Sequence, residues 1–281
     1  MGVGVGIGLR TSNRFSSTGY VYLSETDTAA AAYVVAGYTL SATEKVALDV
    51  YIRAKQAAGI WTSTIVDYVF MGNIAASHAI NIKSPGTKNL TFVNTVAGNH
   101  TSNGWTPNGT TSYGQTGVVP STDLTLYAMG FEYYSRSNLV GGVEIGSLQT
   151  AATNLYQMRV DGLSSANPVL FDAGAAATGR LLGGTVTTSA NSHIYVVTNS
   201  TTETVYINGV SEITSAAKVI GALLPNQQIY IGARNNAGVA DAFDNKECAG
   251  CSIYTSNLTQ ANVTALYNAR QALNTSLTRQ V

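Results

Sequence analysis

The residues best suited to hold a ligand follow a predicted strand in the C-terminal part of the chain. Three carboxylates recur there at every third position, with an arginine and two asparagines just before them. Calcium takes about six to eight oxygen ligands, and the carboxylates and carbonyls of such a loop can supply several. The alternative is a solvated acidic loop that holds no ligand. With one asparagine of a nearby turn added, the candidate ligand-binding residues are Asn208, Arg234, Asn235, Asn236, Asp241, Asp244 and Glu247.

Cys248 and Cys251 form an isolated C-x-x-C pair. A zinc site needs two further ligands, and none of the three histidines stands at a suitable local spacing. The pair is interpreted as small residues that flank a turn before a core strand, and its role stays open. His78 and His100 lie among serine, asparagine and glycine residues, and we interpret them as hydrogen-bonded loop residues rather than as ligand contacts.

The sequence gives no support for enzymatic activity or for binding to nucleic acid or anionic membranes. The chain lacks H-E-x-x-H, G-x-S-x-G and the phosphate-binding P-loop, so we expect no enzymatic activity. Its 281 residues are 45% apolar and only 11% charged, against ~25% in typical soluble domains, and the formal net charge is zero. The composition therefore gives no electrostatic reason to expect nucleic-acid or anionic-membrane binding. No run reaches 18 apolar residues, so membrane insertion is not expected.

Alternating and continuous apolar runs predict an antiparallel β-sandwich. Residues 193–198 are nearly all apolar, which suits a strand buried on both faces. The dipeptide Asn208-Gly209 predicts a tight hairpin turn between strands at 205–207 and 210–213. Residues 228–233 form a further predicted strand, in which Gly232 indicates a bulge or a close backbone approach.

The middle of the chain adds predicted strands. Residues 124–134 form an apolar run broken by Gly130, and residues 155–160 alternate until Asp161-Gly162, a second predicted hairpin turn. Strands at intervals of about 10 to 15 residues, with glycine in the turns between them, are typical of a sandwich.

Two helices are predicted. Ser41 and Glu44 form a capping-box signature, and the apolar residues that follow at helical spacing before Gly59 are Val46, Ala47, Val50, Tyr51 and Ala54. Thr259 is a suitable cap for a short helix that carries Val263, Leu266 and Tyr267 on one stripe. The alanine-rich residues 28–35 give no clear signal for any secondary structure.

The N-terminus alternates glycine with β-branched residues. It lacks the third glycine of G-x-G-x-x-G, and its first charge follows the apolar run, unlike in a signal peptide. One interpretation is an extended assembly arm that adds as a strand to a neighbouring sheet; the other is a frayed terminus. Residues 1–40 are assigned to this arm and residues 41–281 to a single domain. The arm residues are Gly2, Val3, Gly4, Val5, Gly6, Ile7 and Gly8.

After residue 204 the chain reads YINGV, then IYIGAR, then SNLTQANVTALY. This order of a turn-bearing hairpin, a strand that ends in Ile-Gly and a closing helix resembles the laminin-G and concanavalin A-like jelly roll. The resemblance implies a mainly β, antiparallel sandwich with two short helices, in which loops at one end can hold calcium or sugar. The E-x-D-x-x-E strand of hydrolases with this fold is absent.

A second set of short motifs is spread from about residue 41 to the end of the chain. It includes Gly59-Ile60-Trp61, Gly72, Ser77-His78, Asn81-Ile82-Lys83, Pro85, Asn108-Gly109-Thr110, Tyr113-Gly114, Thr116-Gly117, Pro120, Leu277 and Arg279. In their order these motifs resemble a family of tailed-bacteriophage virion proteins with this kind of jelly roll.

The second resemblance implies a biological setting rather than a mechanism. It implies a structural protein of a virion made in the bacterial cytoplasm, as a fibre, capsid decoration or tail appendage. The implied partners are other virion proteins and further copies of the chain, most often in a trimer. The alternative function is a glycan-binding module for attachment to the host surface.

Overall fold

The computed structural model describes residues 20–149, 154–164, 167–174, 178–185, 190 and 192–281. The predicted arm residues 2–8 lie outside this part. The helical segments are α1 (Ser24–Val35), α2 (Ala42–Ala57), η1 (Trp61–Ser63), α3 (Ala75–His78), η2 (Ala97–Asn99), α4 (Pro120–Asp123) and α5 (Gln260–Ser276). The strands are β1 (Thr64–Tyr68), β2 (Thr91–Val93), β3 (His100–Thr101), β4 (Gly104–Trp105), β5 (Tyr113–Gln115), β6 (Met129–Ser135), β7 (Ile145–Leu148), β8 (Leu155–Ser164), β9 (Asn167–Gly174), β10 (Arg180–Gly183), β11 (Ser192–Val197), β12 (Glu203–Ile207), β13 (Val210–Ser215), β14 (Tyr230–Ile231), β15 (Arg234–Asn236), β16 (Val239–Asp241) and β17 (Cys248–Tyr254).

The strands form two sheets. One has eight strands in the order β13-β12-β11-β6-β17-β4-β3, with β1 also paired to β17. The other has nine, in the order β10-β9-β8-β7-β14-β5-β2, with β15 and β16 attached at β7. The pairing is antiparallel along both paths, and β15 runs parallel to β7. The predicted mainly β, antiparallel sandwich is confirmed.

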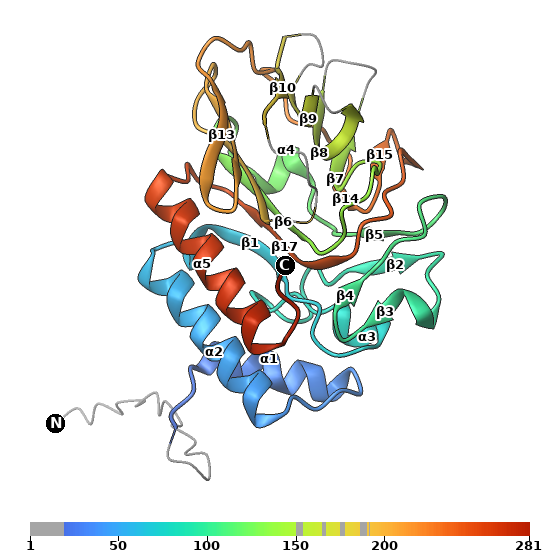
Figure 1. The fold of residues 1–281 in the computed structure, drawn as a ribbon, viewed down its shortest axis with the longest axis vertical. Coiled ribbons are helices and arrows are strands. Elements are labelled where there is room, and N and C mark those ends of the chain that lie inside the picture. Colours follow the sequence, from blue (N-terminus) through green and yellow to red (C-terminus); the bar gives the residue numbers. More distant parts are fainter. Residues whose placement is uncertain (1–19, 150–153, 165–166, 175–177, 186–189, 191) are drawn as a thin grey trace, which may run out of the picture.

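The protein has three layers (Figure 1). The main core lies between the two sheets and contains Trp105, Phe131, Phe171, Tyr195 and Ile253. Helices α2 and α5 lie side by side over the face of the eight-stranded sheet that points away from the main core. Two further apolar clusters fill the space beneath the helices. The eight-stranded sheet is therefore covered on both faces.

Strand β11 shows why its sequence is apolar throughout. Ile194 and Val196 point into the cluster under α5, whereas Tyr195 and Val197 point into the main core. All six residues of the strand are buried. The prediction of a strand buried on both faces is confirmed.

The predicted turns have mixed outcomes. Asn208 and Gly209 both adopt positive φ, at 50° and 78°, in the hairpin between β12 and β13, as predicted. Gly232 has φ +75°, and a Cβ there would collide with Trp105, so the close approach is confirmed although β14 covers only residues 230–231. The prediction of a turn at Asp161-Gly162 was wrong, because β8 continues through both residues to Ser164.

Both predicted helices are present with their caps. The Ser41 side chain accepts a hydrogen bond from the Glu44 backbone N–H in a full capping box, and Thr259 caps α5 in the same manner through Asn262. Helix α5 is longer than expected, at 17 residues. None of the helices among the described residues has the length and apolar character needed to cross a bilayer.

Helix α1 corrects the assignment of residues 1–40 to an extended arm. The segment 24–35 is helical, and Ala29 and Tyr33 are buried in the cluster that includes α2. Its many alanines favour the helix, since alanine has the highest helix propensity. The sequence signal was missed because few large apolar residues mark a stripe.

Cys248 and Cys251 also depart from their interpretation. Both are buried free thiols inside β17 rather than residues that flank a turn. The strand contains a register shift between Cys248 and Gly250. Gly250 leaves space for the Arg270 side chain, which a Cβ at that position would meet.

A buried charge network fastens the helices to the eight-stranded sheet. Lys55 of α2 lies 2.5 Å from Asp67 of β1, and Arg270 of α5 contacts both Asp67 at 3.0 Å and Glu132 of β6 at 2.9 Å. All four side chains are fully buried. The Tyr254 hydroxyl donates to Glu132 at 2.7 Å. Two cations and two carboxylates make the network neutral overall, which makes its burial tolerable.

We predict that Arg270→Met destabilises the protein by about 3–5 kcal/mol, because the substitution leaves Glu132 with no cation and Asp67 with one. Chemical denaturation measures the free energy of unfolding. The control is Lys45→Met, which removes a partly exposed pair with Asp27 and should cost less than about 1 kcal/mol. A loss below about 1 kcal/mol in Arg270→Met would contradict this account of the network.

Candidate functional site

Four of the predicted ligand-binding residues lie on the β15–β16 hairpin, and three of them, Arg234, Asn236 and Asp241, contact one another. Arg234 and Asp241 are directly opposite in register, and the guanidinium makes two hydrogen bonds of 2.8 Å with the carboxylate. Asn236 donates to the same carboxylate at 2.9 Å. Burial alone would raise the pKa of Asp241, but the hydrogen bonds from Arg234 and Asn236 hold it below its usual value. This paired charge is partly exposed, with 23% and 33% of the two side chains accessible.

The pair is one end of a polar row that crosses the nine-stranded sheet. Gly146, Gln157, Asp172 and Arg180 follow one another in register from β7 to β10, and Arg234 lies opposite Gly146. Arg234 donates to Gln157 at 3.2 Å, and Gln157 donates to Asp172 at 2.5 Å. Arg180 makes two hydrogen bonds with Asp172, at 2.7 and 3.0 Å.

The row faces away from the core. Residues directly opposite each other in register share one face of a sheet, and their chain neighbours point to the other face. Those neighbours, Ile145, Met158, Phe171 and Leu181, are all members of the main core. The row therefore lies on the outer face of the nine-stranded sheet, and we call this surface the outer face.

An aromatic group adjoins the row on the same face. Tyr230 lies opposite Gly146 on one side and Gln115 on the other. Its ring lies 4.6 Å from that of Tyr113, and the ring of Phe243 lies 6.3 Å from Tyr113. Tyr113 and Phe243 are half-buried. The outer face thus combines rings with fixed hydrogen-bond donors and acceptors.

The other four predicted residues do not join this surface. Asn235 is 1% exposed, and its amide bonds the backbone of Gln228 and Gly238. Asn208 belongs to a hairpin of the other sheet, where its side chain accepts from the Ser192 backbone. Both asparagines hold turns in place. Neither asparagine therefore lies among the contacting residues of the candidate site.

Asp244 and Glu247 have basic partners of their own. Lys246 lies 3.0 Å from both Asp244 and Glu144, in a fully buried triad. Glu247 pairs with Arg136. The three predicted calcium carboxylates are therefore engaged by three different cations rather than converging. Within the described ranges no group of three or more histidine, cysteine or acidic side chains could hold a metal ion.

Gln157, Asp172 and Arg180 were not among the residues predicted from the sequence. Alternation in residues 155–160 does place Gln157 opposite the apolar face, so part of the signal was present. Asp172 stands within an apolar run, and only the register of β8, β9 and β10 shows that the three side chains meet.

His78 and His100 are hydrogen-bonded, as interpreted, but they are buried in α3 and β3 rather than placed in loops. Their Nδ1 atoms lie 3.1 Å apart in an aromatic cluster with Phe70, Phe92 and Trp105. Burial lowers the pKa of His78 to about 3 and that of His100 to about 4. Two neutral imidazoles, one donating to the other, fit this geometry.

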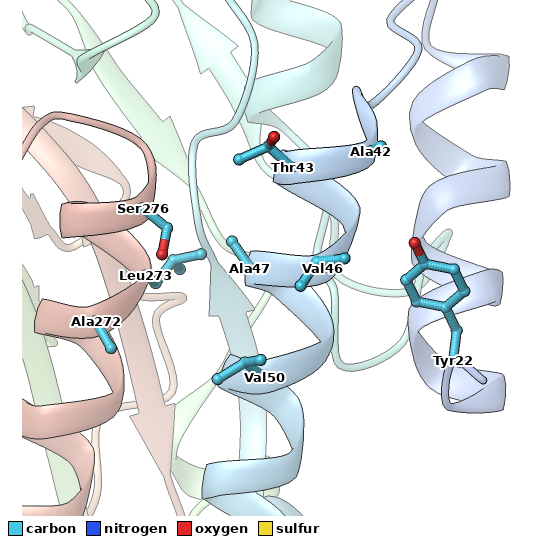
Figure 2. A pocket seen from close by; sticks show the side chains of 9 residues that line it. All are labelled: Tyr22, Ala42, Thr43, Val46, Ala47, Val50, Ala272, Leu273 and Ser276. Carbon is cyan, nitrogen blue, oxygen red and sulfur yellow. The ribbon is translucent and has the colours of Figure 1, made fainter. Parts of the chain in front are cut away.

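A pocket lies on the opposite side of the protein, between α2 and α5 (Figure 2). Its volume is about 370 Å³. The lining is mostly small or apolar and consists of Tyr22, Ala42, Thr43, Val46, Ala47, Val50, Ala272, Leu273 and Ser276. We call it the helix groove.

Comparison with known proteins places the fold but not a family. No family model matches the chain, and no curated protein matches it. A Trypanosoma rangeli sialidase mutant with trans-sialidase activity superposes with a TM-score of 0.52 at 13% identity, over 80% of this chain and 39% of the other. A structure of botulinum neurotoxin type C superposes with a TM-score of 0.50 at 12% identity, over 76% of this chain and 53% of the other. The chain therefore spans about half or less of these proteins, and the likeness supports the β-sandwich fold.

We predict that Glu144→Gln removes a pH-dependent loss of stability. Burial and the nearby Asp244 carboxylate raise the pKa of Glu144 from 4.5 to about 7, despite the opposing effect of Lys246. Between these values the folded chain binds more protons than the unfolded chain, so the contribution of Glu144 to stability falls as pH rises. As pH rises through this window, the free energy of unfolding of the variant should therefore increase relative to that of the wild type by up to about 1.4 kcal/mol per pH unit.

Urea denaturation at several pH values from 5 to 8 measures this difference. Glu247→Gln is the control, since it removes the same kind of charge from a partly exposed pair with Arg136 outside the buried triad. A difference between Glu144→Gln and wild type that does not change with pH would disprove the assignment.

Proposed function

We propose that this chain is a non-enzymatic structural protein of a bacteriophage virion and that its outer face binds a glycan of the host surface. The observation that carries the glycan-binding part is the partly exposed Arg234–Asp241 end of the polar row, which lies on the same sheet face as the half-buried Tyr113 and Phe243 rings. The virion setting is supported by the sequence resemblance and by the low charge of the chain.

The outer face has the chemistry that sugars require. Aromatic rings pack against the apolar face of a pyranose ring, and Tyr113 and Phe243 present partly accessible rings. Arg234 and Asp241 offer a fixed donor and a fixed acceptor for hydroxyl groups, and each holds the other in place. Because these side chains are already ordered, a sugar would bind with little further loss of conformational entropy.

The two structural neighbours agree with this proposal. Botulinum neurotoxin type C depends on interaction with two ganglioside molecules to enter cells, and the other neighbour is a sialidase. Both are proteins of glycan recognition or chemistry on a similar sandwich. A similar fold alone does not assign function, so the proposal depends on the outer face of this chain.

Multiple copies on a particle would make weak sites effective. Partners in the proposal are other virion proteins and further copies of this chain, with a trimer as the expected oligomer. Several copies that engage one host surface raise the avidity well above the affinity of a single site. The localisation is the virion, assembled in the bacterial cytoplasm.

A glycan array probed with the purified chain tests the binding site. We expect binding to a defined set of glycans, and Tyr113→Ala or Arg234→Lys should weaken it at least tenfold, because one loses a ring contact and the other loses the guanidinium fork. Val210→Ala is the control, since Val210 is exposed on the other sheet. No binding at high protein concentration, with or without calcium, would reject a glycan site, and unchanged binding by both variants would reject its location.

Mass spectrometry of purified phage particles tests the virion setting. We expect peptides of this chain in particles that have been purified by density gradient, at a fixed ratio to the major capsid protein. Peptides found only in the host lysate and absent from such particles would reject the structural role, whatever the array shows.

A further inference from the structure

The helix groove is lined by the part of α2's apolar stripe that the fold does not cover. The sequence predicts one buried stripe that includes Val46, Ala47 and Val50, but only Ala47 is buried. Val50 is 46% exposed, and neither valine belongs to the apolar clusters of the described residues. Figure 2 shows Val50 and Ala47 on the side of α2 that faces α5. The groove is thus an apolar surface with polar groups, the Thr43 and Ser276 hydroxyls, among its lining.

The described chain begins at the rim of this groove. Tyr20 donates to Asp49 of α2 at 2.9 Å, and Arg53 donates to the backbone of Val21 at 2.9 Å. Tyr22 itself lines the groove, and the Lys45 Nζ atom lies 4.1 Å from the centre of its ring. Tyr20, the first described residue, therefore lies next to the groove.

The sequence of residues 3–7 matches the groove in length and polarity. Val3, Val5 and Ile7 alternate with glycine, so an extended segment would carry them on one face, about 13 Å from first to last. Ala42 and Val50 are eight residues apart on α2, which corresponds to about 12 Å along the helix axis. The glycine positions leave the opposite side of the segment without side chains.

We propose that the helix groove binds residues 3–7 of a second copy of this chain, in an extended conformation. The inference rests on the assembly role in the proposed function and names the surface that the arm uses. Residues 10–19, which read RTSNRFSSTG, form a mainly polar connection that can reach about 33 Å. A connection within one chain would need only a short turn, because Tyr22 already lines the groove. A longer polar linker suits an arm that reaches a neighbour.

Disulfide trapping between two separately purified variants tests this arrangement. One carries Val5→Cys and the other Val50→Cys, and they are mixed under mild oxidation. The natural cysteines do not interfere, since Cys248 and Cys251 are 0% and 1% exposed. We expect a cross-linked heterodimer, formed at least tenfold faster than in a control mixture of Val5→Cys with Val239→Cys. Val239 is 70% exposed on β16, on the other sheet, so the control tests random collision.

A Val5→Cys/Val50→Cys double variant then shows whether the arm binds the groove of another copy or the groove of its own chain. Dimers and larger oligomers as the main products would support the proposal. A monomer with an internal disulfide would overturn it in favour of the arm's own groove, and equal rates for the Val50 and Val239 mixtures would overturn it altogether. Neither assay uses particles or glycans, so these failures differ from failure of the virion setting or of glycan binding.

Discussion

The buried contact of Asp67 and Glu132 with Lys55 and Arg270 determines which surfaces of this protein remain available. These side chains are fully buried between the eight-stranded sheet and helices α2 and α5. A buried carboxylate without a cation is costly, so the helices cannot leave the sheet without exposing or unpairing charge. The eight-stranded sheet is consequently held between the helices and the main core. On the nine-stranded sheet, the outer face keeps Arg180, Arg234 and Asp241 partly exposed.

The outer face and the helix groove are suited to different partners. The outer face is polar and aromatic, and its arginines are already fixed by carboxylates. The helix groove is narrow and mainly apolar, and it lies beside the first described residues. Separate surfaces would let one chain bind a neighbouring copy and a host glycan at the same time. This division is consistent with an assembled particle that displays many weak binding sites.

Local signals in the sequence predicted local structure well. Asn208-Gly209 predicted the hairpin because few other residue pairs tolerate positive φ twice, and Ser41 and Thr259 predicted helix starts because their hydroxyls accept a backbone hydrogen bond. Helix α1 escaped notice because its buried face carries small side chains.

The candidate site was predicted only in part, because it depends on long-range register. Arg234, Asn236 and Asp241 are close in sequence and were identified, whereas Arg180 and Asp172 join them only through the pairing of β10, β9 and β8. Asp244 looked like a surface ligand, yet the fold places it in a buried triad with Lys246 and Glu144. Likewise Asp67 and Arg270 are 203 residues apart, and no local pattern links them.

Amide chemical-shift mapping of the isotope-labelled chain tests directly whether the outer face is the ligand-binding surface. The chain would be titrated to millimolar concentration with a set of neutral and acidic oligosaccharides. The account predicts shifts concentrated in β5 and β14–β16, around Tyr113, Tyr230 and Arg234, with little change in α2, α5 or β12–β13. Shifts confined to the helices or the β12–β13 hairpin, or no shifts with any oligosaccharide, would contradict it.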